Sequence, residues 1–454
     1  MTPTKLACAA LLLTFFSAGA CSYDIANPNS PDVIGDNPSA AQVGAAANGI
    51  LIATRQDVAD WALDGAIYGR EAYRIDPADP RFVQEMMQGP LDAGSRAFGG
   101  DHWLEPYSAI RSANDLLAVI GTASALTAEQ QSAVSGFAHT LQAYNFIIIL
   151  DSHNQDQIPI AVGTDASGPP APFVTNAEAW THVITLLDQG ATELQGAAFP
   201  FTLPPGFRGF DSTATFLRFN RALRARVAVY RGDFAGALTY LAQSFLDPAA
   251  PLDRGVYMDF GTGAGDVANP LAVSDQTSEN LGHPSLRTQA QLQVGGALDR
   301  RFLSKLVTRP SRSGGTTDTD PIQQISSDLG WTRYPSPSTP IPLIKNEELI
   351  LLRAEANIGL ANLGAAVPDI DLVRSTSGGL PAYSGALDQA SVLNELLYNK
   401  RYSLMYEGAH SWIDYRRYGL TSALQVAPFE RPGPPPDVIF PTLPIPTSET
   451  QPRT

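Results

Sequence analysis

Residues 222–238 read ALRARVAVYRGDFAGAL, and this stretch gives the clearest indication of the architecture. Apolar and small residues recur every three or four positions on both sides of Gly232-Asp233, and this spacing predicts two helices joined by a tight turn. We expect the first helix to span residues 212–231 and the second to span 234–245. The alanines stand where two antiparallel helices must approach closely, so the pair is predicted to be a packed helical hairpin.

This hairpin resembles a tetratricopeptide unit, which is a helix pair of about 34 residues. The chain lacks the strict period of a tetratricopeptide array, so any repeats are degenerate. An ordinary helical hairpin remains the alternative interpretation.

Helical patterns continue on both sides of the hairpin, and the chain is therefore predicted to be mainly α. Thr127 is expected to be the N-cap of a helix that runs to about Leu150. Long stretches between the helices carry no regular pattern, and scattered aromatic residues in them argue against disorder. The other expected helices are 39–55, 103–120, 176–194, 346–361, 364–376 and 388–408, and the irregular stretches are 61–101, 151–175, 246–345 and 409–454.

The composition excludes several classes of partner. The 454 residues include 45 acidic and 30 basic side chains, which gives a formal net charge of −15. Phosphate backbones and anionic membrane surfaces are bound by clusters of Lys and Arg, and the sequence has no such cluster. We therefore expect neither nucleic acid nor an anionic lipid surface as a ligand.

The N-terminus has the pattern of a secretion signal. Lys5 precedes an almost uninterrupted apolar run from Leu6 to Ala20, which is too short to span a bilayer. The run ends in Ser-Ala-Gly-Ala before Cys21, which resembles the lipobox of bacterial lipoproteins. Residues 1–20 are therefore predicted to be a lipoprotein signal peptide, with lipidation at Cys21 and a flexible tether over 21–40; the alternative is an ordinary cleavage site beside a chance cysteine.

The two cysteines, Cys8 and Cys21, both lie in this leader. Nothing downstream can form a disulfide or a thiolate metal site. Helix packing and ion pairs are expected to hold the long loops in place.

Several short motifs of the C-terminal third occur in a fixed order, and the early helix adds another. Taken together they resemble the SusD/RagB family of nutrient-binding outer-membrane lipoproteins. The motifs are Glu348-x-x-x-Leu352-Arg353-Ala354-Glu355-Ala356, Leu372-Val373-Arg374, Asn399-Lys400-Arg401-Tyr402-Ser403-Leu404-Met405-Tyr406-Glu407-Gly408, Trp412-Ile413-Asp414-Tyr415-Arg416-Arg417-Tyr418-Gly419, Pro444-Ile445-Pro446-x-x-Glu449 and, near the N-terminus, Trp103-x-x-x-Tyr107-x-x-Ile110-x-x-x-Asn114. Two departures mark a divergent chain, because the family usually has Glu at the positions of Lys400 and Ser403.

The resemblance implies a single domain over 41–454, in which tetratricopeptide-like hairpins form an α-α superhelical scaffold with long irregular loops on one side. It also implies a protein that is not an enzyme, sits on the outer membrane facing the exterior, binds an oligosaccharide or peptide, and delivers it to a SusC-like TonB-dependent transporter. The expected parts of the domain are 41–245 (N-terminal helices), 246–345 (irregular insert), 346–427 (C-terminal helices) and 428–454 (Pro-rich surface tail).

The charged residues of the shared motifs are predicted to be structural. Arg–carboxylate pairs are bidentate and geometrically selective, which suits them to joining neighbouring helices. The predicted ion-pair residues are Arg353, Glu355, Arg401, Glu407, Asp414 and Arg416.

Loop aromatic residues are the candidates for ligand binding. Flat rings pack against the apolar face of a sugar while polar neighbours bind its hydroxyl groups. Trp103, Trp180 and Trp412 lie on helical patterns and are expected in the core. The ligand-binding candidates are Trp331, Arg333 and Tyr334 in a loop over 321–342, Trp61, Tyr68 and Tyr73 in the early segment, and Tyr257.

Catalytic and metal motifs find little support, and no cofactor is expected. The six histidines form no H-E-x-x-H pattern, and no G-x-S-x-G elbow occurs. Asp151, Asn154 and Asp156 lack the spacing of a calcium loop, so a turn after a helix is the preferred interpretation. Asp60 and Asp64 could serve a glycosidase, but such pairs are common by chance in an acid-rich chain.

Two rival functions stay open. A secreted glycoside hydrolase would be favoured by a carboxylate pair with a raised pKa in a deep cleft. A helical adaptor without a small ligand would be favoured by buried loop aromatics and the lack of a sugar-sized groove.

Overall fold

The structure is a computed structural model that describes residues 34–163, 170–196, 198–274, 277–313, 325–427, 429–431, 433 and 435–451. Cys8, Cys21, the predicted signal peptide and most of the predicted tether lie outside these residues. Residues from Asp36 onward form one compact unit.

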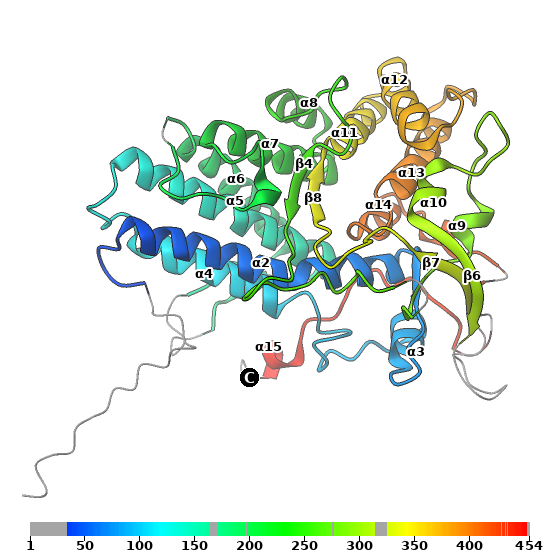
Figure 1. The fold of residues 1–454 in the computed structure, drawn as a ribbon, viewed down its shortest axis with the longest axis horizontal. Coiled ribbons are helices and arrows are strands. Elements are labelled where there is room, and N and C mark those ends of the chain that lie inside the picture. Colours follow the sequence, from blue (N-terminus) through cyan, green and yellow to red (C-terminus); the bar gives the residue numbers. More distant parts are fainter. Residues whose placement is uncertain are drawn as a thin grey trace, which may run out of the picture. The chain divides into compact units, whose positions relative to one another are not determined.

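The helices dominate this unit (Figure 1). Serine or threonine side chains form capping boxes at Ser39, Thr127, Thr175 and Ser212, so polar residues just before an apolar run set where these four helices begin. The helices are α2 (Ala40–Tyr68), α3 (Arg81–Gln88), α4 (Leu104–Ile120), α5 (Ala128–Ser152), α6 (Asn176–Glu193), α7 (Thr213–Tyr230), α8 (Phe234–Gln243), α9 (Ser285–Thr288), α10 (Arg300–Lys305), α11 (Asn346–Gly359), α12 (Leu363–Val373), α13 (Gln389–Ser403), α14 (His410–Arg417) and α15 (Thr447–Thr450).

Neighbouring helices pack as hairpins, most extensively α5 with α6, α4 with α2 and α5, α7 with α8, and α11 with α12. The turn between α7 and α8 uses Gly232 at a φ of 74°, a left-handed conformation that glycine adopts without steric cost. Gly136 of α5 and Gly190 of α6 allow the backbones to touch, because a Cβ on Gly136 would lie 2.8 Å from the carbonyl oxygen of Gly190. The predicted mainly α fold of degenerate helical hairpins is confirmed.

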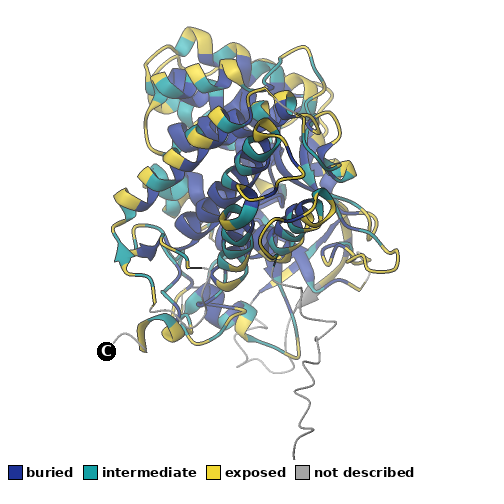
Figure 2. Ribbon diagram, turned by 90° about the vertical axis from the view of Figure 1, so that its left-hand side faces the viewer, coloured by how far each residue is buried: buried dark blue, intermediate teal, exposed yellow. Residues whose placement is uncertain are grey.

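Helix α5 is the central helix of the N-terminal half. Its residues from Phe137 to Ser152 are almost all buried between α2, α4, α6 and α7. Figure 2 shows that buried residues gather in the interior and exposed residues on the outer faces of the helices. It is the one helix in the described part of the chain that is long and apolar enough to cross a membrane, and its burial shows that these apolar residues form the protein core.

Three of the stretches predicted as irregular, 61–101, 151–175 and 246–345, contain short strands. Strands β1 (Ala72–Arg74), β5 (Asn280–Gly282), β7 (Ser326–Trp331) and β6 (Leu306–Ser313) form one antiparallel sheet in the order β1-β5-β7-β6. Strand β4 (Gly255–Met258) pairs with β8 (Ile341–Lys345), and β2 (Ile158–Pro159) pairs with β3 (Phe173–Val174). The prediction of an irregular insert was wrong here, because strands of three to eight residues leave too little alternation to be recognised.

Two further boundaries differ from prediction. Helix α2 continues to Tyr68, so the irregular stretch does not begin at residue 61. Helix α13 ends at Ser403, and residues 404–409 form a turn before α14.

The Pro-rich C-terminal segment is not only a surface tail. Leu443 is fully buried, and Arg431 and Asp437 form a buried ion pair of 2.6 Å. Backbone hydrogen bonds join Val438 to Met87 and Leu443 to Ser152. The segment therefore lies across the ends of α3 and α5 and closes the core there.

Candidate functional site

The aromatic residues predicted to bind a ligand lie mostly in the interior. Trp331 is the last residue of β7 rather than part of a loop, and its ring stacks on Tyr406 with centroids 4.2 Å apart. The Tyr334 hydroxyl donates to the carbonyl oxygen of Tyr406 at 2.7 Å. Trp331 and Tyr334 are 6% and 4% exposed, so they form core around Tyr406.

The early candidates are buried as well. Trp61 and Tyr68 are inward-facing residues of α2, where their rings contact Trp412, and Tyr73 lies on β1 against His283. Tyr257 on β4 is only partly exposed and donates its hydroxyl to the carbonyl oxygen of Asp253. A binding role for these rings stays a prediction, since the described structure gives a ligand no direct access to most of them.

The tryptophans expected in the core are there. Trp103, Trp180 and Trp412 are 4%, 6% and 0% exposed.

Four of the six predicted ion-pair residues form ion pairs. Glu355 of α11 pairs with Lys400 of α13 at 2.8 Å and with Arg417 of α14 at 2.8 Å, and Asp414 pairs with the same two cations at 2.8 and 3.0 Å. This buried cluster joins three helices, and its cations hold the pKa of Glu355 at about 2 against the effect of burial. Arg353 pairs with Asp369 of α12 at 2.6 Å.

Glu407 is the carboxylate of a second buried cluster. It lies 3.0 Å from Lys305, 2.7 Å from Lys345 and 2.9 Å from Arg333. The candidate binding residue Arg333 is thereby a structural partner of Glu407. Although burial favours the neutral acid, these cations hold the pKa of Glu407 well below its usual value.

The remaining two arginines differ from prediction. Arg401 donates to the carbonyl oxygen of Arg70 at 2.8 Å and to Ser285 Oγ at 3.1 Å, and Arg416 donates to the carbonyl oxygens of Pro441 and Asp151. Within the described residues, their hydrogen bonds go to neutral groups rather than to carboxylates. A guanidinium has five donors, so it can satisfy several buried carbonyl groups at once where helices end.

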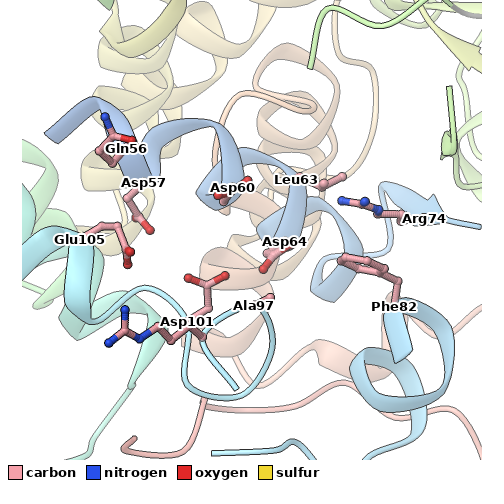
Figure 3. A pocket seen from close by; sticks show the side chains of 11 residues that line it. Gln56, Asp57, Asp60, Leu63, Asp64, Arg74, Phe82, Ala97, Asp101 and Glu105 are labelled. Atoms are coloured by element: carbon pink, nitrogen blue, oxygen red, sulfur yellow. The ribbon is translucent and has the colours of Figure 1, made fainter. Parts of the chain in front are cut away.

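A strongly charged cleft of about 290 Å³ lies beside α2, and we call it the acidic cleft (Figure 3). Helix α2 contributes aspartates three and four residues apart, and this spacing places them on one helix face. The opposite wall comes from residues 96–105, before and at the start of α4. The acidic cleft is lined by Gln56, Asp57, Asp60, Leu63, Asp64, Arg74, Phe82, Arg96, Ala97, Asp101 and Glu105.

The carboxylates of this cleft crowd one another. Burial and then the neighbouring aspartates raise the pKa of Asp60 to about 6, and burial raises the pKa of Asp101 to about 8. Burial also raises the pKa of Asp64. His102 is fully buried beneath them, and although burial disfavours its charge, the carboxylates of Asp57 and Asp101 raise its pKa well above the usual value. Burial and mutual repulsion thus make these carboxyl groups harder to ionise than solvent-exposed ones.

A smaller, apolar pocket of about 140 Å³ shares Gln56 and Asp60 with the acidic cleft. Its other walls include Ala59 on α2 and Phe260, Val267 and Pro270 from the segment after β4. The two concavities together follow the exposed face of α2 and combine acidic and apolar surface.

A separate cleft of about 380 Å³ lies where α6 begins, α7 ends and α14 ends, and we call it the aromatic cleft. Tyr230, Phe234 and Tyr418 line it with partly exposed rings. The guanidinium of Arg231 lies 5.7 Å from the ring centroid of Trp180. Aromatic faces beside amide and guanidinium groups are also suited to a sugar.

The sequence carried a signal for the acidic cleft. Asp57, Asp60 and Asp64 follow the spacing of one helix face, and the pair Asp60 and Asp64 was visible. The sequence does not reveal that Asp101 lies opposite them. Asp151 and Asn154 lie where α5 ends and turns, as predicted.

Comparison with solved structures shows the fold. The chain matches a SusD superfamily protein from Bacteroides vulgatus with a TM-score of 0.67 and 13% identity, over 91% of this chain and 97% of that one. It matches a SusD-like carbohydrate-binding protein from Bacteroides fragilis with a TM-score of 0.67 and 15% identity, over 90% and 98% of the two chains. A laminarin-binding SusD-like protein matches with a TM-score of 0.62 and 15% identity, over 92% and 98%.

No family model matches the sequence, and no curated protein matches it. The chain therefore has the SusD fold, at 13–15% sequence identity to these three solved structures. The predicted resemblance to SusD/RagB proteins is confirmed at the level of the fold.

Proposed function

We propose that this protein is an outer-membrane lipoprotein, anchored through Cys21, that binds an oligosaccharide and delivers it to a SusC-like TonB-dependent transporter. The SusD fold over nine-tenths of the chain is the observation that carries this proposal. The lipobox-like N-terminus supports the anchor. Binding and delivery require no bond to be made or broken.

The acidic cleft and its apolar neighbour are the proposed oligosaccharide site. Carboxylates accept hydrogen bonds from vicinal hydroxyl groups, and Arg74 and Arg96 can donate to ring and hydroxyl oxygens. Phe260 supplies an apolar surface in the adjoining pocket. A flexible chain of sugar units can follow the face of α2 from one concavity to the other.

Binding to purified protein tests the proposal. We expect glycan-array binding and calorimetric titration with β-glucan oligosaccharides, such as those of laminarin, to give a saturable signal. The double variant Asp60→Asn/Arg96→Ala should weaken it at least tenfold, because it removes exposed partners for the ligand without touching the core. Arg231→Ala in the aromatic cleft is the matched control and should bind as the unaltered protein does.

If Arg231→Ala lost oligosaccharide binding and Asp60→Asn/Arg96→Ala kept it, the binding site would be assigned to the aromatic cleft instead. Binding of neither sugars nor peptides would overturn the proposed ligand and leave the adaptor function. The structure meets one expectation of that adaptor, since the loop aromatics are buried, but it fails the other, since clefts of about 290 and 380 Å³ are present.

One observation favours a second function. Asp60 and Asp64 lie in a cleft with raised pKa values, which is the arrangement expected of a glycosidase acid. Incubating the bound oligosaccharide with the protein and measuring new reducing ends tests this. Product formation that Asp64→Asn abolishes would establish the hydrolase.

A further inference from the structure

The floor of the acidic cleft contains a buried carboxylate oxygen with nothing to satisfy it. The Asp57 side chain is 1% exposed, and its Oδ1 lies 2.8 Å from His102 Nδ1. Its Oδ2 has no hydrogen-bond partner among the described residues. A buried carboxylate oxygen left unpaired is costly, so a group that supplies positive charge at this point would stabilise the fold.

Further carboxylates point to the same space. Figure 3 shows Asp57 and Asp64 of α2 directed toward Asp101 on the opposite wall, with Asp60 between them along the helix. Donor atoms of Asp57, Asp101 and His102 all lie within 4.8 Å of one another. Two oxygens that bind one calcium ion at 2.3–2.6 Å can be up to about 5 Å apart, so this spacing fits a shared cation.

His102 acts as a neighbour of this space rather than as a ligand. Its Nδ1 faces Asp57 at 2.8 Å and its Nε2 faces Asp64 at 3.5 Å, so both ring nitrogens are directed at carboxylates. A ring held in this way donates through Nδ1 to Asp57 and leaves Asp57 Oδ2 to turn toward the cleft. The remaining candidate donors are all oxygens, which hard cations prefer.

The acidic cleft also carries an excess of negative charge that a divalent cation could balance. Its lining includes five carboxylates but only two guanidinium groups, those of Arg74 and Arg96, and His102 lies beneath. Arg74 is partly engaged elsewhere, because it pairs with Asp76 at 3.4 Å and lies 3.8 Å over the Phe82 ring. With all groups ionised, two negative charges remain unbalanced, which is the charge that one divalent cation supplies.

We propose that the acidic cleft binds one Ca²⁺ ion through Asp57 Oδ2 and the Asp101 carboxylate, with Asp60 and Asp64 completing the site directly or through water. The ion joins α2 to the segment that precedes α4 and neutralises the floor of the cleft. The site does not require the proposed oligosaccharide, so each can be tested without the other.

Calorimetric titration of EDTA-treated protein with CaCl₂ alone, in the absence of any sugar, tests the site. We expect one ion per chain, with a Kd on the order of 10⁻⁵ to 10⁻³ M as for sites with few carboxylate ligands, and a raised Tm. Asp57→Asn and Asp101→Asn should each weaken binding at least tenfold. Asp211→Asn, at an exposed position before α7, is the control and should bind normally.

Circular dichroism shows whether Asp57→Asn folds, and Asp101→Asn, at a less deeply buried residue, decides the result if it does not. Failure of 10 mM Ca²⁺ to give heat or a Tm shift would overturn the site. The site would also be overturned if a folded Asp57→Asn variant and the Asp101→Asn variant both kept the Ca²⁺ affinity of the unaltered protein. Binding of Zn²⁺ but not of Ca²⁺ would show that His102 is a ligand and overturn the assignment to a hard cation.

Discussion

At the scale of single residues, buried charges explain the unusual C-terminal motif. Lys400 stands where the resembled family has glutamate, and it lies between the carboxylates of Glu355 and Asp414. An acid at this position would be the third carboxylate of the cluster and would leave Arg417 as its only cation. The departure therefore preserves charge balance in the cluster, and it does not contradict a structural role.

Glu407 offers the sharpest test of such clusters. Replacing it with glutamine removes the carboxylate that Lys305, Lys345 and Arg333 share, while keeping the shape of the side chain. Because this leaves buried cations without their partner, we expect the free energy of unfolding to fall by about 3 kcal/mol. Urea denaturation measures the change, and Asp211→Asn should alter it by less than about 0.5 kcal/mol.

A denaturation midpoint equal to that of the unaltered protein would show that the three cations find other partners. Lys345 has one already, since Glu347 lies 3.2 Å away. The predicted loss therefore rests mainly on Lys305 and Arg333.

At the scale of elements, the contact between α2 and the start of α14 depends on a residue without a side chain. A Cβ on Gly65 would lie 2.4 Å from the Cβ of Ala409 and 2.5 Å from its Cα. Both residues are buried, so neither backbone has open space into which to move. The contact therefore fixes how closely the last helices approach α2.

We expect Gly65→Ala to lower the free energy of unfolding by about 1–3 kcal/mol, because it forces the two elements apart. Gly49 lies on the same helix with nothing within 4 Å of the added Cβ. Gly49→Ala should raise stability by about 0.5–1 kcal/mol, since alanine lowers the entropy of the unfolded chain and favours the helix. Thermal and urea unfolding of both variants check the difference in sign, and equal effects would contradict the close-contact explanation.

Helices with a long periodic sequence pattern could be predicted from the sequence. Strands whose hydrogen-bond partners lie far away in the sequence could not. The capping residues Thr127 and Ser212 place helix starts correctly because the signal is local. The local sequence around Trp331 predicts a loop. Its strand β7 forms only by hydrogen bonding to β6, about 25 residues earlier in the sequence, and a local pattern does not reveal such a partner. Its burial depends on Tyr406, which no local pattern connects to it.

The same reason explains the predicted site. The sequence shows Asp60 and Asp64 as a closely spaced pair. Whether they form a site depends on Asp101 and His102, which come close to them only because α4 packs against α2. The sequence pattern ends a helix near residue 55, so Trp61 and Tyr68 fall in the early segment that the family resemblance makes a candidate for ligand binding. The true helix is longer and turns them inward.

At the scale of the whole molecule, the shifted pKa values of buried groups make stability depend on pH in opposing directions. Burial lowers the pKa of His153, His283 and His410 to about 4, so these residues destabilise the fold as pH falls below 6.5. Burial likewise lowers the pKa of Lys305 to about 8. The contribution of Lys305 to the free energy of unfolding therefore changes with pH only above about pH 8. Between pH 6.5 and 8 the trend is decided by the groups whose pKa is raised in the fold, which are buried carboxylates and His102.

Without divalent cations, the protein should therefore lose stability as pH rises from 6.5 to 8. The pKa of Asp101 is about 8 in the fold and near 3.8 when unfolded, so in this window the native state binds the extra proton and a rise in pH favours unfolding. Glu71, with a pKa of about 7, acts in the same direction. Because Asp101 is partly buried and its charge is still partly screened by solvent, we expect a loss on the order of 1 kcal/mol. Urea unfolding in EDTA at both pH values measures it, and Asp101→Asn should flatten the dependence; an unchanged slope in that variant would assign the responsible proton to another group, such as His102 or Glu71.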